Sequence, residues 1–170
     1  MSQVLAYKDF TQKAVLKDVE GIRKRIFSLE FHFLGEEFQH DLYFKVVHGK
    51  LKYRKSSAKS LITHYERILS DNGERTVVYR YDLNPTQEEI QLLKSSNELI
   101  GEVRKQREIY CKENIFIHLD VLESGERFIE VEVKDFYKQF SEEELKLCCY
   151  TTFIQLGFDP EVLINTGYFE

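Results

Sequence analysis

The chain has 170 residues, enough for one domain with its own hydrophobic core. Its net charge of −5 argues against a protein that binds nucleic acid non-specifically, because such binding depends on an excess of basic residues. The sequence contains no long apolar run and no signal-peptide segment, and its three cysteines suggest neither a disulfide framework nor a zinc site. We therefore expect a cytoplasmic protein without a membrane segment, folded as a single domain over residues 1–170.

The first half of the chain alternates between strands and turns after one early helix. A strand is predicted over residues 4–16 and a helix over 17–31, in which Asp18 is the N-cap and apolar residues recur at helical spacing. Short turns at His48-Gly49 and Asn72-Gly73 separate further strands, which are predicted over 40–47, 50–55, 60–69 and 75–83. Strands joined by turns this short pair antiparallel.

The second half adds two helices and three strands. One helix is predicted over 84–99, with Asn84 as its cap, and another over 141–158, where Ser141 and Glu144 form a capping box. Three strands are predicted between them, over 101–111, 114–122 and 127–133. The total is about eight strands and three helices, an α+β composition, and about eight antiparallel strands are enough to close a barrel.

Charged side chains recur two residues apart on several of these strands, so they share one face of the strand. The clearest case is the segment FIEVEV, in which Glu130 and Glu132 lie on one face and Ile129, Val131 and Val133 lie on the other. Other pairs with this spacing are Lys52 and Arg54, Lys105 and Arg107, and His118 and Asp120.

These charged faces have two interpretations. Each pair, taken alone, is typical of a solvated outer face. As a set they favour the opposite arrangement, because the amphipathic helices need an apolar surface to cover and the apolar strand faces supply it. The sequence then predicts an eight-stranded antiparallel β-barrel with a charged, polar lumen and helices packed outside. Bases and carboxylates in one lumen suit a polyanion together with a divalent metal.

Several motifs, in this order along the chain, are similar to those of the CYTH domain family, the triphosphate tunnel metalloenzymes. The longest is VRKQREIYCKENIFIHLDVLESGERFIEVEV, which resembles the family's paired-base strand, its HLD strand and its carboxylate strand. The shorter segments HDLYF, GKLKYR, LITHYER and TGYFE follow the family's order. The resemblance covers nearly the whole chain and implies a tunnel that holds a triphosphate. The family includes class IV adenylate cyclases, thiamine triphosphatases and inorganic tripolyphosphatases.

The resemblance also implies roles for individual residues. The basic residues that would contact phosphate are Lys13, Lys52, Arg54, Arg67, Arg75, Lys105 and Arg107. The carboxylates that would bind one or two divalent metals, Mg²⁺ or Mn²⁺, are Asp9, Asp120, Glu130 and Glu132. The residues expected to act directly in catalysis are Lys13, Arg107 and Glu130.

The first strand departs from the E-x-E-x-K hallmark of the family. The register that fits the following residues best gives DFTQK over residues 9–13, in which Asp9 keeps a carboxylate on a shorter side chain. Thr11 replaces the second glutamate with a neutral hydroxyl. A register onto Lys8 instead would lose both carboxylates. Either way the metal site has lost charge, so the sequence supports one bound metal better than two.

The resemblance implies a metal-dependent phosphohydrolase whose ligand is a nucleoside triphosphate, thiamine triphosphate or inorganic tripolyphosphate. Two alternatives stay open: a class IV adenylate cyclase that converts ATP to cyclic AMP and pyrophosphate, and a catalytically weak nucleotide- or polyphosphate-binding module, which Thr11 supports. We favour hydrolysis because water is easier to accommodate as a nucleophile than a ribose hydroxyl, which needs an oriented nucleoside. The sequence leaves the oligomeric state open, a homodimer included.

Overall fold

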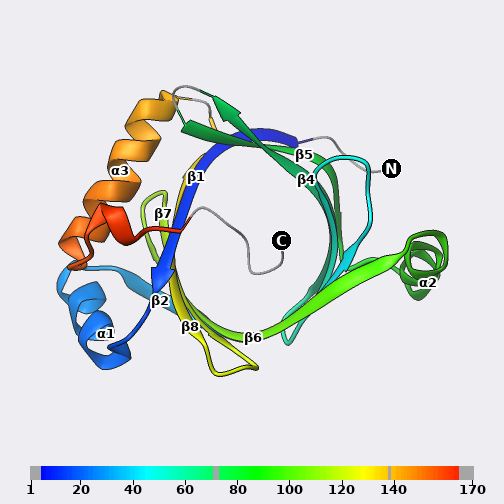
Figure 1. Cartoon of the computed structure of the whole chain (residues 1–170), viewed down its shortest axis with the longest axis horizontal. Coiled ribbons are helices and arrows are strands. Elements are labelled where there is room, and N and C mark those ends of the chain that lie inside the picture. Colours follow the sequence, from blue (N-terminus) through cyan, green and yellow to red (C-terminus); the bar gives the residue numbers. More distant parts are fainter. Residues whose placement is uncertain (1–4, 71–72, 138, 165–170) are drawn as a thin grey trace.

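A closed barrel forms the body of the protein. The computed structural model describes residues 5–70, 73–137 and 139–164, apart from the side chains of residues 5–8, 69–70, 73–75 and 160. Eight antiparallel strands are arranged in the order β1-β5-β4-β3-β2-β6-β7-β8, and β1 pairs with β8 to complete the ring (Figure 1). The helices lie outside this ring. The predicted α+β barrel with external helices is therefore confirmed.

The register of the strands decides which side chains meet inside the barrel. The seam between β1 and β8 runs from Lys8 opposite Asp135 to Val15 opposite Phe128, whereas β1 joins β5 only through residues 5–7. The strands are β1 (Leu5–Val15), β2 (His32–Phe44), β3 (Lys50–Ser56), β4 (Ser60–Ser70), β5 (Gly73–Leu83), β6 (Leu99–Lys112), β7 (Ile115–Leu122) and β8 (Arg127–Asp135).

Strand β8 shows that the barrel has an apolar outer face and a charged inner face. Ile129, Val131 and Val133 are completely buried on its outer face, beneath the helices. Glu130 and Glu132 alternate with them and line the central cavity. Because side chains alternate across a strand, an apolar outer face forces the charged face toward the centre. The predicted charged lumen is confirmed.

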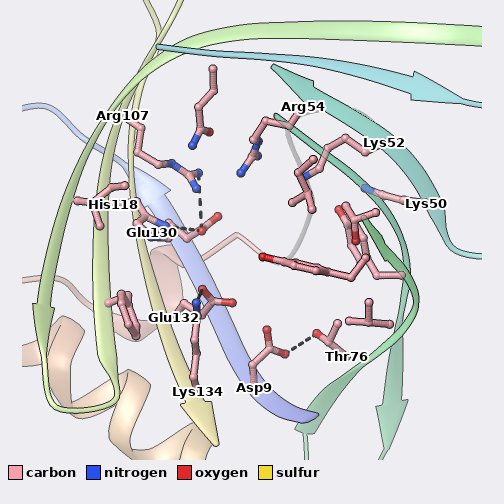
Figure 2. Close-up of a pocket in the computed structure, with 18 of the residues that line it drawn as sticks. Asp9, Lys50, Lys52, Arg54, Thr76, Arg107, His118, Glu130, Glu132 and Lys134 are labelled. Carbon is pink, nitrogen blue, oxygen red and sulfur yellow. Dashed lines mark hydrogen bonds and ion pairs between the residues drawn. The ribbon is translucent and has the colours of Figure 1, made fainter. Parts of the chain in front are cut away.

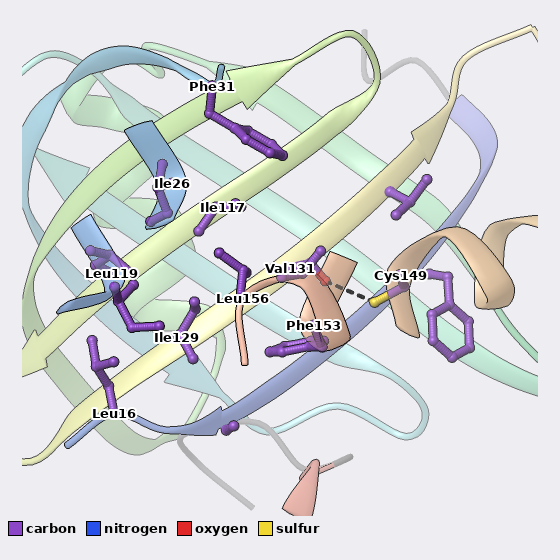
Figure 3. Packing of buried hydrophobic residues seen from close by; sticks show 14 of the residues in the cluster. Leu16, Ile26, Phe31, Ile117, Leu119, Ile129, Val131, Cys149, Phe153 and Leu156 are labelled. Carbon is purple, nitrogen blue, oxygen red and sulfur yellow. Dashed lines mark hydrogen bonds between the residues drawn. The ribbon is translucent and has the colours of Figure 1, made fainter. Parts of the chain in front are cut away.

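The larger apolar core lies between the barrel wall and two helices. Helices α1 (Val19–Ser28) and α3 (Glu142–Gln155) cover the outer faces of β1, β7 and β8, and Figure 3 shows Ile26 and Phe153 among the strand residues Ile117 and Val131. Burying an apolar side chain of this size stabilises the fold by about 1.5–3 kcal/mol. A short 3-10 helix, η1 (Pro160–Val162), follows α3.

A smaller apolar core lies on another side of the barrel, where helix α2 (Gln87–Ser96) packs. Ile90 and Leu93 of α2 are buried against Phe44, Leu51 and Ile62 on the outer faces of β2, β3 and β4. The two cores together anchor the wall on which the inward-facing charges stand. Within the described residues, every helix is too short or too polar to cross a membrane.

The cap predicted for α2 is wrong. Thr86, not Asn84, is the N-cap: its hydroxyl accepts a hydrogen bond from the Glu89 N–H, and the Glu89 carboxylate accepts one from the Thr86 N–H. Asn84 lies in the left-handed region, with φ 50°, and its side-chain oxygen accepts a hydrogen bond from the Ser60 N–H at 3.0 Å. The sequence T-x-x-E at residues 86–89 is a capping-box signature that outweighs a lone asparagine.

Strand β2 is longer than the predicted strand over 40–47. It begins at His32, and its first half pairs with β6 through a register shift between Phe33 and Gly35. A shift of this kind moves the following side chains to the opposite face, so the period of two is broken in the sequence. The prediction therefore missed a segment that places Leu34 and Glu37 on the cavity.

Candidate functional site

The barrel encloses a cavity of about 460 Å³ lined by side chains from all eight strands (Figure 2). Among the described residues, the lining contains nine basic and four acidic side chains. The chain as a whole carries a net charge of −5, so its basic residues are concentrated in this cavity. A basic cavity in an acidic protein is an arrangement suited to an anion.

Most of the residues predicted for the site line the cavity. They are Asp9, Lys13, Lys52, Arg54, Arg67, Lys105, Arg107, Glu130 and Glu132. Asp120 lies just behind this surface, with no exposed area, and is paired with Arg107. The side chain of Arg75 and the TGYFE segment at the C-terminus lie outside the described residues.

A buried carboxylate that the sequence analysis did not select holds one side of the basic wall. Both oxygens of Asp41 on β2 accept hydrogen bonds from Arg54, from Nε at 2.7 Å and from Nη2 at 2.8 Å. The amines of Lys105 and Lys52 lie 3.8 and 4.0 Å from the same carboxylate. Burial alone raises the pKa of Asp41, but these three cations outweigh it and hold the pKa far below its usual value.

Arg107 and Asp120 form a second pair of the same type. Nε and Nη2 of Arg107 on β6 donate hydrogen bonds to the two oxygens of Asp120 on β7, each at 2.8 Å. Burial raises the pKa of Asp120, and Arg107 more than reverses that effect, so the carboxylate stays ionised. Nη2 of Arg107 also lies 3.8 Å from Glu130 (Figure 2).

The two buried lysines between these arginines are electrostatically strained. Burial, together with the neighbouring charge of Arg54, lowers the pKa of Lys52 to about 7. Burial and the charges of Arg107 and Arg54 lower the pKa of Lys105 well below its usual value. A bound polyanion would relieve this repulsion, because it would add negative charge beside both amines.

The acidic side of the cavity lies across from Arg54 and Arg107 (Figure 2). It includes one close pair of carboxylates, Asp9 on β1 and Glu132 on β8. Burial, and then the charge and hydrogen bond of Asp9, raise the pKa of Glu132 to about 7 against the opposing effect of Lys134. Thr11 faces Glu132 across the two strands, and its Oγ1 is buried without a hydrogen-bond partner in the described part of the chain. Asp9 also accepts a hydrogen bond from Thr76 (Figure 2).

This acidic side fits one hard cation better than two. Within residues 5–164, as far as the structure describes them, no three His, Cys, Asp or Glu side chains converge on one point. Asp9 and Glu132, with the hydroxyl of Thr11 beside them, nevertheless offer two carboxylates and an unpaired oxygen. Mg²⁺ in proteins is commonly held by one or two carboxylates and completes its shell with water and phosphate oxygens, and Mn²⁺ favours the same ligands.

Glu130 stands between the basic and the acidic sides. Nδ1 of His118 lies 2.9 Å from Glu130 Oε1, so this ring nitrogen donates to the carboxylate. Burial raises the pKa of Glu130, but the hydrogen bond from His118 and the charge of Arg107 hold it well below its usual value. Glu130 is therefore an ionised carboxylate on the cavity surface, and Lys13 lies directly opposite it in the register of β1 and β8.

Several lining residues were missed although their positions follow the same alternation. Lys50 precedes Lys52 by two residues on β3, and Lys134 follows Glu132 by two on β8. Counting in steps of two beyond the predicted pairs would have found both. Lys59, in the turn between β3 and β4, had no such signal.

Comparison with known proteins agrees with this architecture. The CYTH domain family model matches residues 12–146, and the chain belongs to the CYTH domain family. Among curated protein sequences, none matches this chain.

Solved structures with similar folds cover nearly the whole chain. The PH1012 protein of Pyrococcus horikoshii is 27% identical, with a TM-score of 0.80 over 94% of this chain and 96% of that one. A proposed adenylate cyclase from Vibrio parahaemolyticus has a TM-score of 0.76 at 13% identity and 95% coverage of both chains. HpAC1 from Hippeastrum, a proposed adenylyl cyclase described as having a dominant triphosphatase activity, has a TM-score of 0.62 at 17% identity, over 95% of this chain and 91% of that one.

Proposed function

We propose that the protein is a metal-dependent phosphohydrolase that binds an organic or inorganic triphosphate inside its barrel. The observation that carries the proposal is the concentration of nine basic side chains, counted among the described residues, around one cavity of a chain whose net charge is −5. Burying cations together is costly unless an anion compensates them. A triphosphate is a compact polyanion whose oxygens suit arginine and lysine donors.

The phosphates would lie between strands β3 and β6. Lys52 and Arg54 project from β3, and Lys105 and Arg107 project from β6. The further proposed phosphate contacts are Lys13, Arg67 and Arg75. A triphosphate would accept hydrogen bonds from donors on several strands of the barrel. These contacts would also orient the triphosphate for in-line attack on a phosphorus atom.

The proposed metal is Mg²⁺ or Mn²⁺. Asp9 and Glu132 would hold it, with Glu130 and Asp120 as the remaining proposed ligands. When bound, the metal would neutralise charge on the phosphate oxygens. Asp120 would first have to loosen its two hydrogen bonds to Arg107. One metal supported mainly by Asp9 and Glu132 is therefore the arrangement that we favour.

Three residues would act on the reacting groups. Arg107 would donate to the phosphoryl oxygens, where negative charge develops, and Lys13 would do the same from the β1 wall. Glu130, kept ionised by His118 and Arg107, would orient an attacking water by accepting a hydrogen bond from it. Lys13 and Glu130 lie opposite each other in the register of β1 and β8, which supports this division of roles.

Two alternatives follow from the same cavity. The likeness to the proposed adenylate cyclase of Vibrio parahaemolyticus favours a class IV cyclase, with ATP as the substrate and cyclic AMP and pyrophosphate as the products. The triphosphatase activity described for HpAC1 favours hydrolysis of a nucleoside triphosphate, thiamine triphosphate or tripolyphosphate. We place hydrolysis first because a water molecule needs no oriented nucleoside.

A catalytically weak binding module is the third candidate, and Thr11 is the residue that favours it. Its hydroxyl carries no charge beside Glu132, so metal binding there would be weak. The double variant Asp9→Glu with Thr11→Glu restores the family's acid pair. We expect at most a small gain in turnover if the native site is adapted to its own geometry; a large gain would identify a degraded enzyme.

Product analysis tests the proposal. The protein would be incubated separately with ATP, thiamine triphosphate and tripolyphosphate in the presence of Mg²⁺ or Mn²⁺, and the products resolved by ³¹P NMR and chromatography. Release of orthophosphate supports the hydrolase, and cyclic AMP with pyrophosphate identifies the cyclase. If a triphosphate binds but no product forms, the result supports the catalytically weak binding module. We also propose that residues 1–170 form one tunnel domain, because the neighbours cover at least 94% of the chain.

A further inference from the structure

Asp41 occupies a central place in the basic wall, although it does not itself line the cavity. Its side chain has no exposed area. Its strand, β2, runs between β3 and β6, the strands that carry Lys52, Arg54 and Lys105. In the register of β2 and β3, Asp41 lies directly opposite Arg54. One buried carboxylate is therefore shared by three cations from both neighbouring strands.

The contact with Arg54 fixes the orientation of the guanidinium. Asp41 accepts hydrogen bonds from Nε and Nη2, at 2.7 and 2.8 Å. This pairing uses two of the five N–H groups and leaves the edge that carries Nη1 directed away from the carboxylate. Arg107 is held by Asp120 through the same two atoms. The wall thus presents two guanidinium groups, each oriented by a buried carboxylate behind it.

A long side chain without such a partner would have to be ordered by the ligand itself. Ordering one flexible side chain on binding costs about 0.5–1.5 kcal/mol, and a small displacement of a contact group weakens its hydrogen bonds to a fixed ligand. Asp41 removes this cost before the ligand arrives. It also offsets the mutual repulsion of Lys52, Lys105 and Arg54, which lie within 4.0 Å of it.

We propose that Asp41 is a positioning residue for triphosphate binding, which holds Arg54, Lys52 and Lys105 in place for the phosphates without contacting them. The inference rests on the proposed function. It makes a prediction opposite in sign to that of simple electrostatics. Removing a negative charge from the wall of an anion site strengthens binding if only net charge matters, whereas the loss of positioning weakens it.

The test is tripolyphosphate binding to the full chain with Asp41→Asn, measured by calorimetry without a divalent metal. We expect the dissociation constant to rise at least about tenfold. The Nε–H signal of Arg54 in ¹⁵N NMR should lose its hydrogen-bonded shift and its protection from exchange. The matched control is Asp82→Asn, which removes the carboxylate 2.5 Å from Arg80 in an ion pair away from the cavity and should leave binding unchanged.

Each outcome decides the question. Equal or tighter binding by a folded Asp41→Asn variant overturns the inference while the proposed function stands. If the unaltered protein does not bind tripolyphosphate, the proposed function falls and the inference with it. If Asp41→Asn does not fold, Asp41→Glu keeps the charge but displaces it by one methylene. Weaker binding by that variant supports positioning, and unchanged binding contradicts it.

Discussion

Arg107 on β6 and Asp120 on β7 lie directly opposite each other and are joined by two hydrogen bonds of 2.8 Å. Asp120 has no exposed area, and Arg107 reaches the cavity from the same pair. A residue predicted to bind phosphate and a residue predicted to bind metal are thus each other's partners. Arg107 therefore already has a buried counter-charge in the wall before any ligand binds, and a bound triphosphate would contact a guanidinium that Asp120 holds in place.

Breaking this pair should cost much of the stability of the fold. In Arg107→Met, Asp120 would stay buried without its partner, and we expect the free energy of unfolding to fall by about 3–5 kcal/mol. Adding Asp120→Asn should recover part of the loss, because the buried charge is then removed as well. Urea unfolding of both variants measures this. Arg80→Met, in a partly exposed pair with Asp82, should cost about 1 kcal/mol or less. If Arg107→Met and Arg80→Met lower the free energy of unfolding equally, the buried pair of Arg107 and Asp120 has no special role in stability.

Lys52 should take up a proton when a polyphosphate binds. With a pKa of about 7 in the cavity, its amine is mostly neutral at about pH 8, and a bound polyanion favours the charged form. Calorimetry in buffers of different ionisation enthalpy should therefore show more proton uptake at about pH 8 for the unaltered protein than for Lys52→Met, by up to about one proton. At about pH 6 the amine is already charged, so the difference should vanish. If the unaltered protein and Lys52→Met differ in proton uptake by the same amount at both pH values, the lowered pKa of Lys52 is refuted.

The same shift has a consequence for folding stability. The pKa of Lys52 is lower in the folded protein than its usual value of 10.5, so the unfolded chain binds the extra proton between about pH 7 and that value. The contribution of Lys52 to the free energy of unfolding should therefore rise with pH across this window. Lys52→Met should flatten the rise, and an unchanged pH profile would argue that the amine is fully charged in the folded state.

Glu130→Gln should lower turnover while sparing the fold. The amide keeps the size of the side chain but loses the negative charge that His118 and Arg107 stabilise. We expect the rate of phosphate release from the preferred triphosphate to fall on the order of 10²-fold, which is typical when a reacting group is no longer held in position. Glu126→Gln, an exposed residue in the turn before β8, is the control and should be unaffected. Full activity in Glu130→Gln would remove this residue from the mechanism.

Metal affinity should depend on the pair formed by Asp9 and Glu132. Mn²⁺ binding to the unliganded protein can be followed by the loss of the free-ion signal in electron paramagnetic resonance, independently of any activity. Asp9→Asn and Glu132→Gln should each weaken binding by roughly tenfold or more, since each removes one of the two carboxylates. Asp82→Asn should not. If all three variants bind Mn²⁺ like the unaltered chain, the metal does not lie at this pair.

Much of the fold could be predicted because the charged alternation is strict on the strands that carry the site. Glu130 and Glu132 on β8 stand two apart and alternate with apolar residues, so their inward face followed from the period of two. Lys105 and Arg107 on β6 show the same spacing, although their neighbours Arg104, Gln106 and Glu108 are polar. The register shift after Phe33 broke this period in the first half of β2, and that half was not predicted. Periodicity predicts a strand only where pairing is regular.

Part of the site could not be predicted because a sequence does not show which carboxylate meets which cation. Asp41 lies between His40 and Leu42 in HDLYF, and only the pairing of β2 with β3 places it opposite Arg54. The sequence likewise did not show that Asp120, a proposed metal ligand, lies opposite Arg107 on β6. The role of a buried charge depends on its neighbours on adjacent strands, which are far away in the sequence.

Calorimetric titration of the unaltered protein with tripolyphosphate, pyrophosphate and orthophosphate, without divalent metal so that no turnover occurs, tests the central claim most directly. If the cations of β3 and β6 act together on one chain of phosphates, affinity should rise by about tenfold or more with each added phosphoryl group and should weaken steeply with salt. Equal affinity for the three anions, or no binding of any of them, would contradict the account.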